Sequence, residues 1–198
     1  GFEADDILGT IVETCADDDL EIIVASGDMD TLQLIRDKDV MVYTLKRGIN
    51  DTVLYDEDAV RDRFGFGPEH LVDYKGLSGD PSDNIPGVPG IGEKTATTLI
   101  TKLGSIEDIY AALERGEEEL KEAGIKPRTI TLLRENQEEA EFSKLLATIR
   151  CDAPIVFHMP EARWVDACDM RKVIELFSEL EFRSLVARAK EVLGLGEE

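Results

Sequence analysis

Seven acidic side chains are gathered in three short stretches of this 198-residue sequence, and clustered carboxylates are typical ligands of divalent cations. The stretches are GFEADD, ASGDMD and GDPSDN, and the seven acids are Glu3, Asp5, Asp6, Asp28, Asp30, Asp80 and Asp83. If the fold brings them together, they repel one another unless cations lie between them. Because no His or Cys accompanies them, a hard ion such as Mg²⁺ or Mn²⁺ is favoured. Two such ions about 4 Å apart can activate water and stabilise the leaving oxygen of a phosphodiester.

Each acidic stretch also has a structural explanation that needs no metal. The acids of GFEADD could simply favour a helix N-terminus, where negative charge interacts well with the helix dipole. Asp30 could be the N-cap of the helix that follows it. Asp80 and Asp83 could be turn formers in a loop that also contains proline and serine. An EF-hand is excluded, because Leu32 occupies the place of the third oxygen ligand and the loop glycine is absent.

A glycine-rich segment, GVPGIGEKTA, follows the third acidic stretch directly. Glycines permit positive φ and close backbone approach, and a helix that begins near Glu93 would direct its free amides outward. Phosphate binds at such helix starts, and Lys94 adds a positive charge beside this one. The segment does not match the P-loop pattern, and a glycine-rich turn without a ligand is the alternative. Because backbone contacts read no bases, binding of nucleic acid here would be independent of sequence.

Hydrophobic periodicity predicts the elements that must position these residues. The runs EIIVAS at 21–26 and VMVYTL at 40–45 are typical of buried strands, and DAPIVF at 152–157 favours an edge strand. Apolar residues at helical spacing predict helices at 4–15, 31–36, 57–64, 68–77, 93–102, 105–115, 127–146, 170–180 and 183–193. The alternation of helix and strand at the start predicts an α/β fold with a parallel sheet, followed by a helical part. Asp28 and Asp30 would then lie at the carboxyl end of the first strand, where open α/β sheets bind ligands.

The charge balance of the chain is unusual for a protein that binds phosphate. The formal net charge is −21, from 43 Asp and Glu against 22 Lys and Arg. Such a surface repels nucleic acid, because phosphate binding depends on Lys and Arg. Since the acidic residues are spread over the whole chain, one metal site does not account for them, and we favour a source with high internal salt.

The cysteine count and the lack of long apolar runs indicate a cytoplasmic protein. Cys15, Cys151 and Cys168 are widely spaced and odd in number, which favours reduced thiols over disulfides. No apolar run approaches the roughly 20 residues of a membrane span, and no secretory signal is visible. We therefore expect no membrane partner.

In their order and spacing, GFEADD, SGDMD and GLSGDPSDNIPGVPGIGEKTA resemble the 5′ to 3′ exonuclease domain of bacterial DNA polymerase I, in the flap endonuclease superfamily. The stretches LATIRCDAPI and LFSELEFRSLVAR resemble the end of that domain. The resemblance implies a PIN-like parallel sheet followed by a helical subdomain, and hydrolysis of phosphodiesters at 5′ ends or flaps in primer removal and repair. It also implies duplex or 5′-flap DNA as partner, a polymerase portion in the same natural chain, a monomer, and a place near the bacterial nucleoid.

The same resemblance assigns roles to the acidic residues. The family's first acidic cluster corresponds to Glu3, Asp5 and Asp6. The group that binds the second ion corresponds to Asp28, Asp30, Asp80 and Asp83. Asp28 would bridge two Mg²⁺ or Mn²⁺ ions, and Asp5, Asp28 and Asp30 would be the catalytic residues.

The glycine-rich segment resembles the helix-hairpin-helix of the family, which grips the duplex downstream of the cut and often holds a K⁺ ion. The residues that we expect to contact DNA are Gly87, Val88, Gly90, Ile91, Gly92, Lys94 and Thr95. We expect three parts of the chain: an α/β metal-binding core at 1–50, a helical subdomain at 51–150 with the hairpin at 78–103, and a strand and helices at 151–198 that pack back on the core.

The sequence also departs from the family pattern. The family begins with roughly a hundred further residues that supply the first strand, more metal ligands and a basic helical arch. We therefore expect a sheet that is incomplete at the N-terminus, an incomplete first metal site and poor cleavage. Two alternatives stay open: a non-catalytic helix-hairpin-helix module that binds DNA, and a Mg²⁺-dependent α/β phosphatase, suggested by Asp28 and Asp30.

Overall fold

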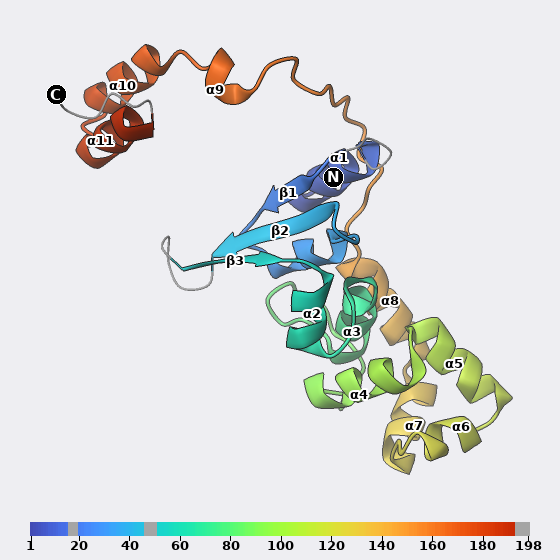
Figure 1. Ribbon diagram of the computed structural model, residues 1–198. Coiled ribbons are helices and arrows are strands. Elements are labelled where there is room, and N and C mark those ends of the chain that lie inside the picture. The colour runs from blue at the N-terminus through green and yellow to red at the C-terminus, as the bar shows by residue number, and fades with distance from the viewer. Residues whose placement is uncertain (16–19, 46–50, 193–198) are drawn as a thin grey trace. The chain divides into compact units, whose positions relative to one another are not determined.

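The computed structural model describes residues 1–15, 20–45 and 51–192 (Figure 1). It divides into two compact units, Gly1–Val156 and Phe157–Glu198. The first unit holds the sheet and helices α1 to α8, and the second holds α9 to α11. The predicted boundaries near 50 and 150, and the return of the last part onto the core, stay predictions. No helix in the described ranges has the length and apolar character needed to cross a bilayer.

A small mixed sheet forms the start of the first unit, in the order β1-β2-β3. β1 (Ile22–Ala25) pairs in parallel with β2 (Val40–Leu45), and β2 pairs antiparallel with β3 (Thr52–Tyr55). The predicted α/β class and its first two strands are thus confirmed. The third strand escaped prediction, because a run of four residues directly before a helix carries too little periodicity to be distinguished.

The two faces of this sheet differ in burial. Val24, Val42 and Tyr55 are cross-strand neighbours on one face, and all three are buried in the core with Leu32 and Leu34. Large apolar side chains are exposed on the opposite face: Ile23, Tyr43, Leu45 and Leu54. Successive side chains of a strand point to opposite faces of the sheet. Because both faces of this sheet carry apolar side chains, the strands are nearly continuous apolar runs in the sequence.

The helices that precede and follow β1 in the chain each begin at one of the acidic stretches. α1 (Ala4–Thr14) begins directly after Glu3, and η1 (Met29–Leu34) begins directly after Asp28. η1 is a 3₁₀ helix, whereas an α-helix at 31–36 is predicted from the sequence. Its tighter start follows from the Asp28 side chain, which accepts a hydrogen bond from the backbone N–H of Asp30. α2 (Glu57–Phe64) follows β3 and ends at a glycine in the left-handed region.

The rest of the first unit is helical, as predicted. Its elements are η2 (Pro68–His70), α3 (Leu71–Ser78), α4 (Glu93–Leu103), α5 (Ile106–Arg115), α6 (Glu118–Glu122), α7 (Pro127–Glu135) and α8 (Gln137–Ala147). The single helix predicted at 127–146 is wrong, because the backbone of Asn136 (φ −130°, ψ 37°) leaves the helical region between α7 and α8. The helix predicted at 68–77 begins with a separate 3₁₀ turn at Pro68.

Helix α8 contacts several elements that are distant in sequence. Its Ser143 hydroxyl accepts a hydrogen bond of 3.0 Å from the backbone N–H of Gly87. Its Lys144 ammonium lies 2.6 Å from the carboxylate of Asp73, which is 2% exposed on α3. The carbonyl of its last residue accepts a hydrogen bond of 3.0 Å from the Gln33 side chain in η1. α8 is therefore tied to η1, to α3 and to the loop that precedes α4.

The edge strand predicted at 152–157 is wrong. This segment has no strand, since the backbone N–H of Ala153 donates to the Thr10 hydroxyl and that of Ile155 bonds back to the Ala153 carbonyl. The segment is anchored to α1 by a side chain and not by a backbone ladder. A mostly apolar run of six residues does not distinguish a strand from an extended segment held by a side chain.

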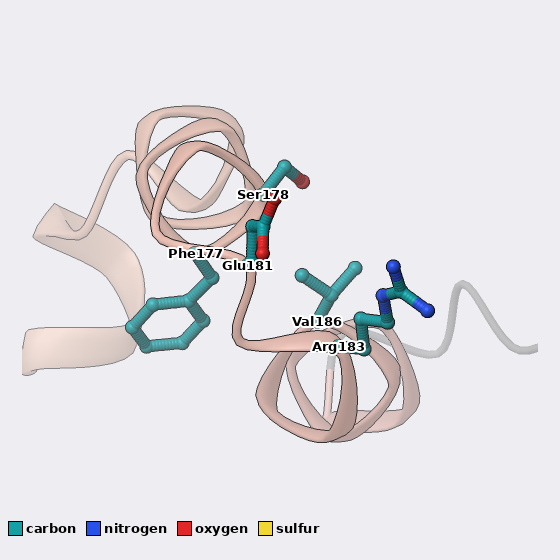
Figure 2. A pocket seen from close by; sticks show the side chains of 5 residues that line it. All are labelled: Phe177, Ser178, Glu181, Arg183 and Val186. Carbon is teal, nitrogen blue, oxygen red and sulfur yellow. The ribbon is translucent and has the colours of Figure 1, made fainter.

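The second unit is a set of three short helices: α9 (Trp164–Ala167), α10 (Met170–Glu179) and α11 (Arg183–Val192). They confirm the helices predicted at 170–180 and 183–193, although residue 193 lies outside the described residues. No described side chain of α10 is buried. Figure 2 shows a hollow where α10 meets α11, lined by Phe177, Ser178, Glu181, Arg183 and Val186. Of the described residues that line it, Glu181 alone carries a carboxylate.

Replacement of Gly87 by alanine should destabilise the fold. Gly87 has φ +62°, and a Cβ there would lie 2.2 Å from the backbone nitrogen of Gly79. We expect Gly87→Ala to lower the free energy of unfolding by about 2–4 kcal/mol in urea denaturation. The matched control is Gly92→Ala, where a Cβ meets nothing within 4 Å. Equal stability of the two variants would contradict the close backbone contact.

Candidate metal centre

A closed loop between α3 and α4 carries two of the predicted metal ligands. The backbone groups of Asp80 and Ile85 exchange two hydrogen bonds of 2.9 Å, which close the loop at its base. Beneath this pair, Gly79 and Gly87 meet with positive φ values and no space for side chains. The N–H of Val88 then bonds to the carbonyl of Leu77 at the end of α3. The loop is thus held at both ends by backbone contacts.

This loop places its two acids beside an acid from η1. Side-chain oxygens of Asp30, Asp80 and Asp83 lie within 4.8 Å of one another. Within the described residues this is the group of three acidic, His or Cys side chains that could hold a metal ion. The sequence prediction that Asp30 joins the acids of GDPSDN, fifty residues away, therefore has a direct counterpart in the structure.

Lys75 lies at the centre of this acidic group and was missed in the sequence analysis. Its ammonium contacts Asp30, lies 2.7 Å from Asp80 and lies 3.8 Å from Asp83. Only 17% of the Lys75 side chain is exposed. Its place one turn before the end of α3, as the nearest cation to GDPSDN, was the available signal. The ammonium occupies the position in which a cation balances three carboxylates.

The surroundings move the pKa values of two of these acids in opposite directions. Burial raises the pKa of Asp30, and the contact with Lys75 offsets this only in part. Burial would also raise the pKa of Asp80, but hydrogen bonds from Lys75 and Ser82 lower it to about 2. The Lys75 pKa is raised, because its carboxylate partners outweigh its burial. The same lysine thus lowers the pKa of Asp80 and limits the rise in the pKa of Asp30.

Asp28 lines the pocket that contains this acidic group and follows the carboxyl end of β1, as predicted. It is the N-cap of η1, so the alternative in which Asp30 caps this helix is wrong. Asp28, Asp30, Asp80 and Asp83 line one pocket of about 480 Å³. The other side chains of that pocket include four that the sequence analysis did not single out: Arg63, Phe64, Tyr74 and Glu93.

The first acidic stretch approaches this pocket through one residue. Burial raises the pKa of Asp5, and the charges of Asp28 and Asp30 raise it further, so the three carboxylates lie close enough to interact. Asp6 is engaged elsewhere, since its two oxygens accept backbone hydrogen bonds from Glu3 (2.9 Å) and Arg150 (2.8 Å). Asp5 therefore interacts electrostatically with Asp28 and Asp30, whereas Asp6 is the N3 residue of the capping box at the start of α1, whose N-cap is Glu3. The Glu3 side chain is exposed.

The predicted hairpin is present as α3, the glycine loop and α4. Its seven predicted DNA contacts fall into two groups by exposure. The exposed or half-buried group consists of Gly90, Gly92, Lys94 and Thr95. The buried group consists of Gly87, Val88 and Ile91. The buried group fixes the loop in the core, and the Gly87 amide already donates to Ser143. Only the exposed group presents backbone and charge at the start of α4.

Two family models match consecutive parts of the chain. A model described as the 5′-3′ exonuclease N-terminal resolvase-like domain matches residues 1–65, and one described as the 5′-3′ exonuclease C-terminal SAM fold matches residues 66–169. The junction between them falls between α2 and α3, so the acidic pocket takes residues from both.

Curated relatives and solved structures agree with these models. DNA polymerase I of Bacillus caldotenax is 43% identical over 94% of this chain, and that of Bacillus subtilis is 39% identical over 96%. The chain spans 20% of the length of each.

Among solved structures, T5 5′-exonuclease with bound divalent metal ions (zinc) has a TM-score of 0.62 at 26% identity, over 74% of this chain and 50% of that one. A bacteriophage T5 flap endonuclease in a pseudo-enzyme–product complex with DNA and metal ions has a TM-score of 0.61 at 25% identity, with the same coverage. With its two matching models, its acidic pocket and its hairpin, this chain belongs to the 5′-3′ exonuclease family.

Proposed function

We propose that this chain hydrolyses phosphodiester bonds at 5′ ends and flaps of duplex DNA, as part of a bacterial DNA polymerase I. The observation that carries this proposal is the convergence of the Asp30, Asp80 and Asp83 carboxylates in the loop that leads from α3 into α4. Family membership supports the reaction class. The polymerase portion as a covalent partner, the monomeric state and the place near the nucleoid stay predictions that rest on the resemblance.

The acidic residues fit a divalent cofactor. Three carboxylates with oxygens inside 4.8 Å, without His or Cys, are a donor set for Mg²⁺ or Mn²⁺. We assign Asp30, Asp80 and Asp83 to one ion, and Asp5 with Asp28 to a second. When bound, the two ions would supply activation of water and stabilisation of the leaving oxygen.

The chain's own residues divide the remaining work. The Asp28 carboxylate lines the pocket and is oriented by the hydrogen bond that it accepts from the Asp30 N–H. The prediction that Asp28 is a ligand of both ions rests on the resemblance. Asp5 lies in the first turn of α1 and interacts electrostatically with Asp28 and Asp30, and the adjacent Glu3 would be a further ligand. Asp6 accepts backbone hydrogen bonds from Glu3 and Arg150, and its predicted role as a metal ligand stays a prediction.

The hairpin would hold the duplex while the acids act on it. Gly90 and Gly92 leave backbone groups accessible at the start of α4, and Lys94 adds an exposed positive charge. The acidic loop and the hairpin share one backbone junction, where Gly79 and Gly87 meet. This junction would fix the distance between the hairpin that holds the duplex and the acidic residues that act on the phosphodiester. The K⁺ ion at this hairpin stays a prediction.

The function is tested with a 5′-end-labelled flap duplex and Mn²⁺. We expect slow cleavage that a chelator abolishes, and a loss of about a hundredfold or more in Asp28→Asn and Asp80→Asn, because each removes a metal ligand. Asp58→Asn is the control, since the Asp58 side chain is 92% exposed on α2. Cleavage that survives both site substitutions would contradict the proposed function.

Removal of the Lys75 charge should make the fold dependent on divalent ions. Lys75→Met leaves three close carboxylates unbalanced, so we expect the free energy of unfolding to fall by about 1–3 kcal/mol in chelator. Mn²⁺ should restore most of this loss, as measured by thermal unfolding with and without the ion. The control is Lys121→Met, which removes an exposed ion pair on α6. An equal effect of Mn²⁺ on both variants would argue against a cation site at Lys75.

The affinity for Mn²⁺ should depend on pH at values above the ordinary pKa of an aspartate side chain. Protons compete with the ion at Asp5 and Asp30, because burial raises the pKa of each. As the pH falls, these two acids are therefore protonated first, while Asp80, with a pKa of about 2, stays charged. Mn²⁺ titrations at a series of pH values should show weakening above the usual pKa of an aspartate, about 3.9. An affinity that is constant down to that pH would be inconsistent with these shifts.

A further inference from the structure

One cationic side chain of the acidic pocket has no role in the assignment above. Arg63 lies in the last turn of α2, and its Nη1 donates a hydrogen bond of 2.5 Å to the Tyr55 hydroxyl. Its guanidinium carbon lies 5.7 Å from the centre of the Tyr55 ring and 5.2 Å from that of Phe64. Because Tyr55 is buried and Phe64 is half-buried, this pair of rings forms a fixed support for an exposed arginine.

The charge of Arg63 is not balanced by a neighbouring acid. Within the described ranges, Arg63 has no carboxylate oxygen inside 4.0 Å, whereas Arg61 on the same helix pairs with Glu57 and Asp58. Yet Arg63 lines a pocket with five acidic side chains, and Lys75, the other cation of that pocket, is engaged with three of them. In a chain of net charge −21, an arginine that is held on aromatic rings and has no ion pair among the described residues is available to an anion.

We propose that Arg63 binds an internal phosphodiester of the DNA strand that enters this pocket. The inference rests on the proposed function and adds an anchor to it. The five carboxylates that line the pocket repel a phosphate backbone. Arg63 lines the same pocket, so its positive charge would hold the strand there against that repulsion.

The chemistry of arginine suits this role better than that of lysine. The guanidinium has five N–H donors in a rigid fork, and Tyr55 accepts from only one of its nitrogens. The remaining donors can form two parallel hydrogen bonds to phosphate oxygens. Since the plane of the group is set by Tyr55 and Phe64, less freedom is lost on binding than for a mobile side chain. Arg63 is therefore a positioning residue for the substrate.

The test measures affinity for a 5′-flap duplex by fluorescence anisotropy over a range of salt concentrations, with Ca²⁺ in place of Mn²⁺ to slow cleavage. We expect Arg63→Gln to weaken binding about tenfold and to reduce the slope of log affinity against log salt by about 0.9, the value for one phosphate contact. Arg63→Lys should keep the slope and recover only part of the affinity. Tyr55→Phe keeps the ring but removes the hydroxyl, and should cost about two- to threefold.

Arg61→Gln is the matched control, because Arg61 has the same side chain two residues away and is paired with acids of its own helix. It should bind as the unchanged chain does. Mn²⁺ affinity without DNA should be equal in all variants, which separates a phosphate contact from damage to the metal site. Flaps with a 5′-hydroxyl and a 5′-phosphate should show the same loss, since the contact is internal.

The outcomes separate this inference from the proposed function. If the unchanged chain binds the duplex and Arg63→Gln binds it equally well with the same salt slope, the inference is overturned and the function stands. A loss confined to flaps with a 5′-phosphate would overturn the internal contact in favour of a terminal one. If the unchanged chain does not bind the flap duplex at all, the proposed function and the inference fail together.

Discussion

The contact between the backbones of Gly79 and Gly87 is the constraint on which the site depends. At these two positions the chain enters and leaves the acidic loop with no space for a Cβ on either side. This contact closes the loop that carries Asp80 and Asp83. The glycine-rich part of the hairpin begins at the same contact. The buried hydroxyl of Ser143 fixes that junction to α8.

Local charge and total charge lead to different expectations about DNA. The net charge of −21 determines the electrostatic potential far from the surface. Salt at physiological concentration screens this potential beyond about 8–10 Å. Inside that distance the pattern differs, because Lys75 already balances three carboxylates and Arg63 and Lys94 present cations at the pocket and at the hairpin. An acidic chain can therefore approach a polyanion where its few cations, and any bound metal ions, face the backbone.

Sequence reasoning reached the α/β class, the grouping of Asp30 with Asp80 and Asp83, and the hairpin, because each depends on local patterns such as strand runs, paired acids or glycine spacing. It failed where a distant partner decides the outcome. The segment 152–157 is held by Thr10 of α1 and not by a strand, and the break at Asn136 has no glycine or proline to mark it. Lys75 and Arg63 were missed for the same reason, since only the fold shows which acids and rings surround them.

The ties of helix α8 have a consequence for how the site is lost on unfolding. Its last turn is bonded to Gln33 in η1, which carries Asp30, and its Ser143 holds the base of the loop that carries Asp80. Fraying of α8 would release η1 and the acidic loop at the same time, so the acidic cluster belongs to a single cooperative unit. In hydrogen exchange, amides of η1 and of the acidic loop should then open with a common free energy, although fifty residues separate them in the chain.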